Sequence, residues 1–221
     1  MSNFSLLLKV APFDFAGIFG NFFSRWYYYV VLVIFLALVV LFAIKKKGSR
    51  NSLTDTQKIV YVAIFSALSF VANYFTIKVS DALQISLVAT VGFVSGYLLG
   101  AGWGFTAAFV GDLICGIVAP FGTYNPIIGI GTGLWGFIPG VLFSIKWGNK
   151  YLKTVLSFVM GFVLNSFAIN TFGLSVMYSL SFASLMALLP IKLLTVAINA
   201  GFSFALLVLL PKILPKNKFY L

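Results

Sequence analysis

Long apolar stretches alternate with short polar ones along most of the chain. Each stretch is close to the roughly 20 residues that a helix needs to cross a bilayer, so the pattern predicts seven membrane-spanning helices. They are expected at 27–44, 58–77, 85–100, 102–119, 126–145, 154–177 and 185–210. The stretch from Gly92 to Gly104 is rich in glycine, which predicts a tight helical hairpin formed by the third and fourth spans.

A polar, basic segment separates the first span from the other six. The predicted organisation is an interfacial or re-entrant segment (1–26), an accessory transmembrane helix (27–44), a basic cytoplasmic linker (45–57), a six-span core that binds substrate (58–213) and a cytoplasmic tail (214–221). A short extra span is the alternative for the first of these segments. Thr54 and Gln57 have the spacing of a capping box, which predicts a helix start at the beginning of the core.

Composition supports a membrane protein. Of the 221 residues, 61% are hydrophobic and 9% are charged, and the mean hydropathy is +1.07. These are too few polar side chains to cover a water-soluble globule, so we expect an all-α integral membrane protein. The net charge of +11 is therefore interpreted as a signal of topology, and nucleic acid is not an expected partner.

The basic residues predict the orientation of the chain. If the loops are placed alternately on two sides, one side receives eleven of the 15 basic residues: Lys45, Lys46, Lys47, Arg50, Lys58, Lys146, Lys150, Lys153, Lys212, Lys216 and Lys218. The other side receives Lys9, Arg25 and Lys78. The positive-inside rule then places the C-terminus in the cytoplasm and the N-terminus outside.

The residue types that are missing exclude most enzymatic chemistry. The chain has no His, and its four acidic residues are all Asp: Asp14, Asp55, Asp81 and Asp112. Acid–base catalysis by His and a His-ligated metal site are thus excluded. A Walker-type phosphate loop, GxxxxGK[ST], is also absent. We expect no catalytic residues, no metal and no cofactor in this chain.

Two charged residues fall inside predicted spans, where charge is costly. Asp112 is expected either to contact a ligand or to tie down the backbone of the following loop. Lys192 is expected either to pair with an anionic group of a substrate or to extend to the outer headgroups. A third possibility is an ion pair between the two.

Amides and aromatic residues complete the candidate site. Asn165 and Asn170 are five residues apart, so they share a helix face only if the helix is irregular. They suit recognition of a heterocycle, although hydrogen bonds between helices explain many such amides, and Asn199 is a third of this kind.

Further candidates lie in or near the outer loops. Asn73 and Lys78 flank the exit of the second span, and Tyr124 and Asn125 end a turn-rich loop. A glycine-rich stretch around Trp135 follows, and together with this loop it is expected to form one wall of a pocket. The glycines there permit close helix contacts or irregular backbone. An ordinary connector is the alternative for the loop.

Three motifs give the six-span core a family resemblance. Ala63 and Ala67 form a small-residue strip on which another helix can pack. The segment 111–126 reads GDLICGIVAPFGTYNP, and 189–199 reads LPIKLLTVAIN. In this order the motifs resemble the S components, or substrate-binding subunits, of energy-coupling factor (ECF) vitamin transporters, in particular the folate-like branch. The resemblance covers about 54–213, and the chain departs from that branch at Asn125, where the branch has Phe before the proline.

The resemblance implies a six-helix bundle, here preceded by one extra helix. It implies a subunit in the plasma membrane of a prokaryote that binds a vitamin from outside, closes the outer loops over it as lids, and has no enzymatic activity. Ala63 and Ala67 would then dock on a membrane coupling protein, which is driven by two cytoplasmic ATPases. Candidate ligands are a folate-like compound, pantothenate and a queuosine precursor. We expect contacts from Asn73, Lys78, Tyr124, Asn125, Trp135, Asn165, Asn170 and Lys192, with Asp112 structural or ligand-binding.

Other functions remain as hypotheses. An autonomous secondary transporter or channel is the first alternative, and Asp112 is its one intramembrane candidate for proton coupling. An intramembrane enzyme and a purely structural subunit are the others, and the absence of His and Glu weighs against the enzyme.

Overall fold

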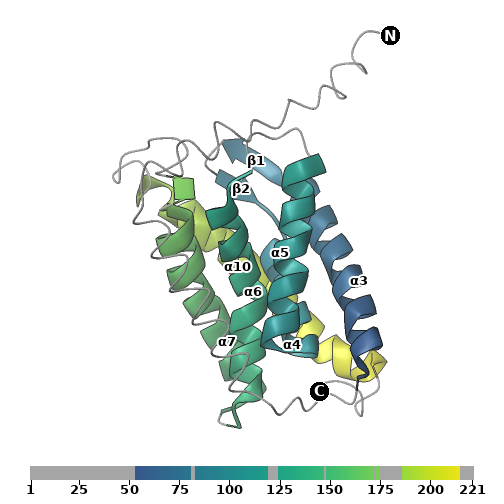
Figure 1. Cartoon of the computed structure of the whole chain (residues 1–221). Coiled ribbons are helices and arrows are strands. Elements are labelled where there is room, and N and C mark those ends of the chain that lie inside the picture. The colour runs from purple at the N-terminus through teal and green to yellow at the C-terminus, as the bar shows by residue number, and fades with distance from the viewer. Residues whose placement is uncertain are drawn as a thin grey trace.

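The computed structural model describes residues 53–80, 83–118, 124–146, 148–171, 173–174 and 186–214. The predicted accessory helix at 27–44 and the segment 1–26 lie outside these residues, as do most of the basic linker and the tail. The described residues form a helical bundle with one short β-hairpin (Figure 1).

The bundle contains the six predicted core helices. They are α3 (Asp55–Tyr74), α4 (Val88–Leu99), α5 (Ala101–Val118), α6 (Pro126–Ser144), α7 (Lys150–Gly161) and α10 (Leu189–Ile213). Helix α7 continues directly into a π-helical segment, η1 (Phe162–Ile169). The antiparallel strands β1 (Ile77–Ser80) and β2 (Leu83–Ile85) join α3 to α4. The helical fold class is therefore confirmed, and the hairpin adds a feature too short for hydropathy to reveal.

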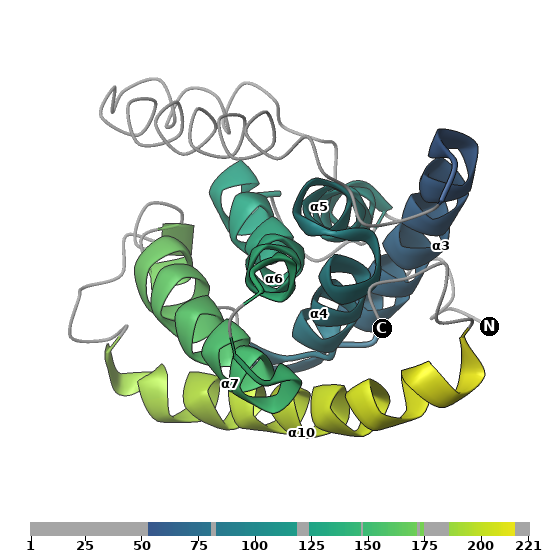
Figure 2. The same cartoon turned by 90° about the horizontal axis from the view of Figure 1, so that it is seen from below.

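Most of these helices have the dimensions of membrane spans. Within the described residues, five helices are long and apolar enough to cross a bilayer: Asp55–Tyr74, Ala101–Val118, Pro126–Ser144, Lys150–Ile169 and Leu189–Ile213. Helix α4 is shorter, with 12 residues, and nearly all of them are buried. It lies next to α5 and α6, and α10 runs along one side of the bundle (Figure 2).

Local signals explain where several elements begin. Thr54 and Gln57 form the predicted capping box, in which the Thr54 hydroxyl accepts from the Gln57 amide at 3.3 Å and the Gln57 side chain accepts from the Thr54 amide at 3.1 Å. A single residue, Gly100, joins α4 to α5. Its φ of 89° lies in the region that favours glycine, which confirms the tight hairpin expected there.

Glycines also bring three helices into backbone contact. A Cβ on Gly96 of α4 would overlap the carbonyl oxygen of Gly136 on α6, and a Cβ on Gly136 would overlap the carbonyl of Gly104 on α5. A side chain at any of these positions would push the helices apart. The glycines of α6 thus serve close helix contact, one of the two roles expected from the sequence.

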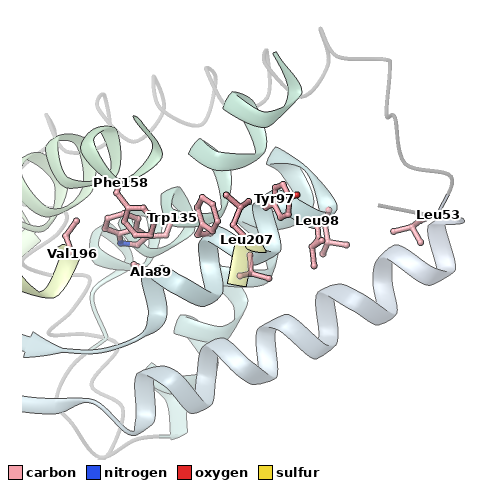
Figure 3. Packing of buried hydrophobic residues seen from close by; sticks show 11 residues of the cluster. Leu53, Ala89, Tyr97, Leu98, Trp135, Phe158, Val196 and Leu207 are labelled. Atoms are coloured by element: carbon pink, nitrogen blue, oxygen red, sulfur yellow. The ribbon is translucent and has the colours of Figure 1, made fainter. Parts of the chain in front are cut away.

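The main apolar cluster brings together buried side chains from α4, α6, α7 and α10 (Figure 3). It includes Phe93 and Tyr97 of α4, Trp135 of α6 and Phe158 of α7. The Phe93 and Phe158 rings stack at 5.5 Å between centroids, and the Trp135 and Phe158 rings lie 5.6 Å apart. The cluster makes a rigid base on which the polar residues of α6, η1 and α10 are held.

The two ends of the bundle differ in charge. At one end, which we call the hairpin end, α3 finishes beside the β1–β2 hairpin and α4, α6 and α10 begin (Figure 1). At the opposite end, the helix termini and the α6–α7 turn carry Lys58, Lys146, Lys150, Lys153 and Lys212. The positive-inside rule predicts that this lysine end faces the cytoplasm and the hairpin end faces outside.

Candidate functional site

Several predicted site residues lie toward the hairpin end, on different helices. Asn73 is in the last turn of α3, Tyr124 and Asn125 precede α6, and Lys192 is in the first turn of α10. The backbone of Lys78 lies in β1, but its side chain is outside what the structure describes. The remaining candidates form two polar groups, one around Asp112 and one around η1.

Asp112 is the centre of the first group. It is 9% exposed, and its Oδ1 accepts hydrogen bonds from Asn73 Nδ2 at 2.7 Å and from Thr132 Oγ1 at 3.2 Å. These bonds join α5 to α3 and to α6. Residues 119–123 of the loop that follows α5 lie outside the described residues, so a tie from Asp112 to that loop and a contact with a ligand both stay predictions.

Tyr124 packs against the same group. Its ring lies against Gly116 of α5, and its hydroxyl lies against Gly129, where an added Cβ would also come within 3.1 Å of Asp112 Oδ2. The hydroxyl is buried and has no hydrogen-bond partner within the described residues. Burial first, and the Asp112 carboxylate second, raise the pKa of Tyr124, so the phenol stays neutral and keeps a proton to donate.

Asn125 has a local structural role. Its Oδ1 accepts from the Ile127 amide at 2.9 Å, which caps α6, and its Nδ2 donates to the Gly173 carbonyl at 3.0 Å. Both ends of the amide therefore bind backbone. These bonds link the start of α6 to the chain that follows η1.

The second polar group depends on the π-helix. At the end of η1 the backbone N–H of Asn170 donates to the backbone carbonyl of Asn165, so residues five apart lie one above the other. In the orientation that satisfies its neighbours, the Asn165 amide donates to Asn170 Oδ1 at 3.3 Å. The irregular helix that would place both amides on one face is therefore present.

Trp135 and Gly131 hold the Asn165 amide in place. The amide oxygen accepts from Trp135 Nε1 at 2.5 Å, and its nitrogen donates to the Gly131 carbonyl at 3.3 Å. A Cβ on Gly131 would overlap the end of the Asn165 side-chain amide, so a glycine is required for this approach. Trp135 thus orients Asn165 through its Nε1, and the Trp135 ring packs on Gly161.

Lys192 reaches the same π-helical segment. Its side chain is 8% exposed, and Nζ donates to the Ser166 carbonyl at 3.3 Å. Thr171 Oγ1 donates to the same carbonyl at 3.3 Å. An ammonium has three protons to donate, and in the described part of the chain Ser166 is its one acceptor, so it has capacity for another.

The structure corrects two of the possibilities for Lys192. Within the described residues the ion pair joins Lys58 to Asp55, and Asp112 and Lys192 are not paired with each other. The buried Lys192 side chain also does not extend to the outer headgroups, because it turns toward η1. Pairing with a substrate group remains a prediction.

The small-residue strip faces outward. Ala63 and Ala67 are exposed on α3, whereas Ser66 and Ser69 of the same helix are buried against the bundle. Ser66 Oγ donates to the Ala107 carbonyl of α5 at 3.0 Å. The strip is therefore available to another helix, and docking there remains a prediction.

The sequence did not identify Thr132, which donates to Asp112. It also assigned no specific role to Asn199, which is 1% exposed and accepts a hydrogen bond from Thr90 of α4. The available signal was the same in both cases, a polar residue within an apolar helix. That signal identifies a buried contact but does not identify its partner.

Comparison with known proteins agrees with this fold. The family model described as "ECF-type riboflavin transporter, S component" matches residues 53–215. Among solved structures, the crystal structure of FolT bound with folic acid has a TM-score of 0.60 and 22% identity, and the match covers 68% of this chain and 94% of that chain. At 22% identity, this similarity shows that the two chains share a fold.

A curated relative matches part of the chain. The uncharacterized protein MG313 homolog of Mycoplasma pneumoniae (strain ATCC 29342 / M129 / Subtype 1) is 25% identical over 135 residues. The match covers 60% of this chain and 45% of that protein, so the chain spans less than half of its length. The family model, by contrast, covers well over half of this chain, and the chain therefore belongs to the S components of ECF-type riboflavin transporters, a family of multi-pass membrane transport subunits.

Proposed function

We propose that this chain captures a flat, nitrogen-rich vitamin of the flavin or pterin type outside the cell and delivers it to an ATP-driven partner module. The matching family is described by riboflavin, and FolT was crystallised with folic acid. The ring systems of riboflavin and folic acid share a fused pyrimidine and pyrazine. One edge of that unit offers carbonyl and ring-nitrogen acceptors beside N–H donors.

The polar group on η1 carries this proposal. Two amides, Asn165 and Asn170, lie on one face of a widened helical turn inside an apolar bundle. An amide donates and accepts at once, which suits the alternating edge of a heterocycle. Asn165 is held by Trp135 and Gly131, whereas no described residue accepts from the Asn170 side-chain nitrogen, which in this proposal donates to the ligand. Short π-helical segments are frequent at functional sites.

Lys192 and Tyr124 extend the proposed site. The Lys192 ammonium lies against η1, where it donates to the Ser166 carbonyl, and in this proposal it also donates to a carbonyl or anionic group of the ligand. The Tyr124 hydroxyl supplies a further donor beside Asp112. Because Lys192 and Tyr124 are both donors, we expect the ligand to carry hydrogen-bond acceptors on more than one edge.

The chain needs a separate source of energy in this proposal. Its sequence has no phosphate-binding loop, so ATP hydrolysis falls to two cytoplasmic ATPases acting through a membrane coupling protein. The exposed strip of Ala63 and Ala67 on α3 is the proposed docking surface for that coupling protein. Small residues there let a partner helix approach closely.

The substrate is tested with purified full-length protein. Thermal unfolding is followed with riboflavin, folic acid, pantothenate and the queuosine base, and denatured samples are extracted for mass spectrometry of retained small molecules. We expect riboflavin or folic acid to raise the melting temperature most. Pantothenate has no aromatic ring, so a larger shift with it would overturn the proposed substrate class.

The site is tested with matched amide variants. Asn170→Ala removes an amide from η1, and affinity for the bound vitamin is expected to fall about five- to tenfold, as for one lost hydrogen bond. Asn149→Ser is the control because Asn149 caps α7 at the lysine end and serine preserves the cap. Unchanged affinity in the first variant would remove η1 from the site.

A further inference from the structure

Helix α4 begins without a cap from its own sequence. Leu87 occupies the N-cap position, and no side chain there accepts a hydrogen bond. Leucine is a poor N-cap because it has no polar atom for the first amides of the helix. The Thr90 backbone amide, in the first turn, donates to two acceptors: Asn199 Oδ1 of α10 at 2.9 Å and the Leu87 carbonyl at 3.1 Å.

Asn199 also binds the backbone that leads out of the hairpin. Its Nδ2 donates to the Ser86 carbonyl at 2.8 Å and to the Thr195 carbonyl, on its own helix, at 2.8 Å. Ser86 directly follows β2. Thr90 Oγ1 donates to Asn199 Oδ1 at 2.8 Å and lies within 3.2 Å of the Asn199 backbone carbonyl. Asn199 is 1% exposed, so water does not compete for these bonds.

The face of α10 that carries Asn199 also carries Lys192. The buried residues of α10 are Lys192, Val196, Asn199, Ser203 and Leu207. They recur every three or four residues, so they form one stripe on the helix. Lys192 contacts η1 and Asn199 contacts Ser86, and these two contacts are seven residues apart on one helix.

We propose that Asn199 is a positioning residue that holds the β1–β2 hairpin in place over the ligand site at the hairpin end. Its oxygen caps α4, and its nitrogen fixes the Ser86 carbonyl and with it the returning strand β2. The inference rests on the proposed function, because it places ligand entry at the hairpin end.

The two roles of Asn199 are separated by substitution. Asn199→Leu keeps most of the volume and removes every polar contact of the side chain. Thr90→Val removes one hydroxyl from the same cluster but leaves the bond between Asn199 and Ser86. Leu87→Ser, at a position that is 42% exposed, gives α4 a cap of its own. The double variant N199L/L87S therefore has the cap without the hold on the hairpin.

The first measurement needs no ligand. Hydrogen exchange of the amides in 77–87 is followed in the full-length variants, together with the melting temperature. We expect faster exchange in N199L and in N199L/L87S, and exchange near that of the unmodified protein in T90V, which controls for lost stability. Equal acceleration in T90V and N199L at matched loss of melting temperature would overturn the inference, as would slow exchange in N199L.

The second measurement uses the vitamin that binds most tightly, riboflavin or folic acid. Its dissociation rate is expected to rise about tenfold in N199L and in N199L/L87S, and to change little in T90V. A normal dissociation rate in a variant whose hairpin exchanges fast would overturn the link to ligand access. If neither vitamin binds, the proposed substrate class fails, and the exchange experiment still decides the role of Asn199 in holding the hairpin.

Discussion

The Asp112 carboxylate lies inside an apolar bundle, and its neighbours account for how the bundle accommodates it. Asn73 and Thr132 both donate to it, from α3 and α6. A buried polar group is tolerated when it is hydrogen-bonded, and its removal leaves its partners unsatisfied. This residue therefore belongs to the structure of the site whether or not it touches a ligand.

A substitution at Asp112 distinguishes this role from proton coupling. Asp112→Asn keeps an oxygen that accepts from Asn73 and Thr132, so we expect a folded protein with vitamin uptake close to that of the unmodified chain. Asp112→Leu removes the acceptor of Asn73 Nδ2, whereas the Thr132 hydroxyl keeps the Ile128 carbonyl as an acceptor, and stability should fall by about 1–3 kcal/mol. Uptake in cells and thermal unfolding measure the two effects. Loss of uptake in the folded asparagine variant would favour the autonomous, proton-coupled transporter.

Gly131 tests the geometry of the η1 group. In Gly131→Ala the new Cβ collides with the end of the Asn165 side-chain amide, so the amide is displaced from Trp135 and Asn170. We expect weaker vitamin binding, by about tenfold or more, and a lower melting temperature. The matched control is Gly102→Ala on α5, where a Cβ meets nothing within 4 Å.

The control also has a predicted sign. Alanine is the better helix former, so Gly102→Ala should leave binding unchanged and leave stability equal or raised by up to about 1 kcal/mol. If the two alanine variants bind the vitamin equally well, the Asn165 amide is not part of the binding site. Titration calorimetry and thermal unfolding provide both values.

Element by element, the sequence predicted the helices better than the connections between them. The long apolar stretches predicted all six core helices, and the spacing of Thr54 and Gln57 predicted the start of α3. The β1–β2 hairpin was missed because strands of 4 and 3 residues have no distinct hydropathy signal. The π-helix was foreseen only as a condition for Asn165 and Asn170 to meet, because periodicity does not report a local change in turn size.

Side-chain partners were harder to predict than elements. Asp112 was recognised as buried, but its partners Asn73 and Thr132 lie 39 and 20 residues away in sequence. Such pairings depend on how α3, α5 and α6 pack, which a single sequence does not specify. Lys192 illustrates the same limit, because its direction toward η1 depends on the path of α10.

Helix α3 carries the prediction about the partner. Ala67→Trp places a bulky side chain on the exposed small-residue strip, so we expect reduced uptake in cells and unchanged vitamin affinity of the purified protein. Ala205→Trp, at an exposed alanine of α10, is the control and should leave both unchanged. Equal uptake in the two variants would place the docking surface elsewhere.

At the scale of the whole molecule, the lysines predict which end faces the cytoplasm. In a background with Cys115→Ala, we expect Lys146→Cys at the lysine end to react with a membrane-impermeant maleimide only after cells are permeabilised. Phe75→Cys, which replaces a side chain that is 76% exposed at the hairpin end, should react in intact cells. The reverse pattern of labelling would invert the orientation.

The whole bundle has the features of a binding subunit that relies on others for energy. Its polar groups gather between helices at one end, and its small-residue strip faces outward on α3. A ligand can shift the chain between states only by binding one of them more tightly. Binding alone therefore cannot accumulate a ligand inside the cell, and under the proposed function the energy for release comes from an ATP-driven partner module.

The most direct test of this account is retention of radiolabelled riboflavin or folic acid by sealed proteoliposomes that contain this chain alone. We predict label that saturates at one molecule per chain and does not increase with the internal volume of the liposomes. Label that accumulates in proportion to internal volume would identify an autonomous transporter. Absence of bound label with either vitamin would contradict the proposed substrate class.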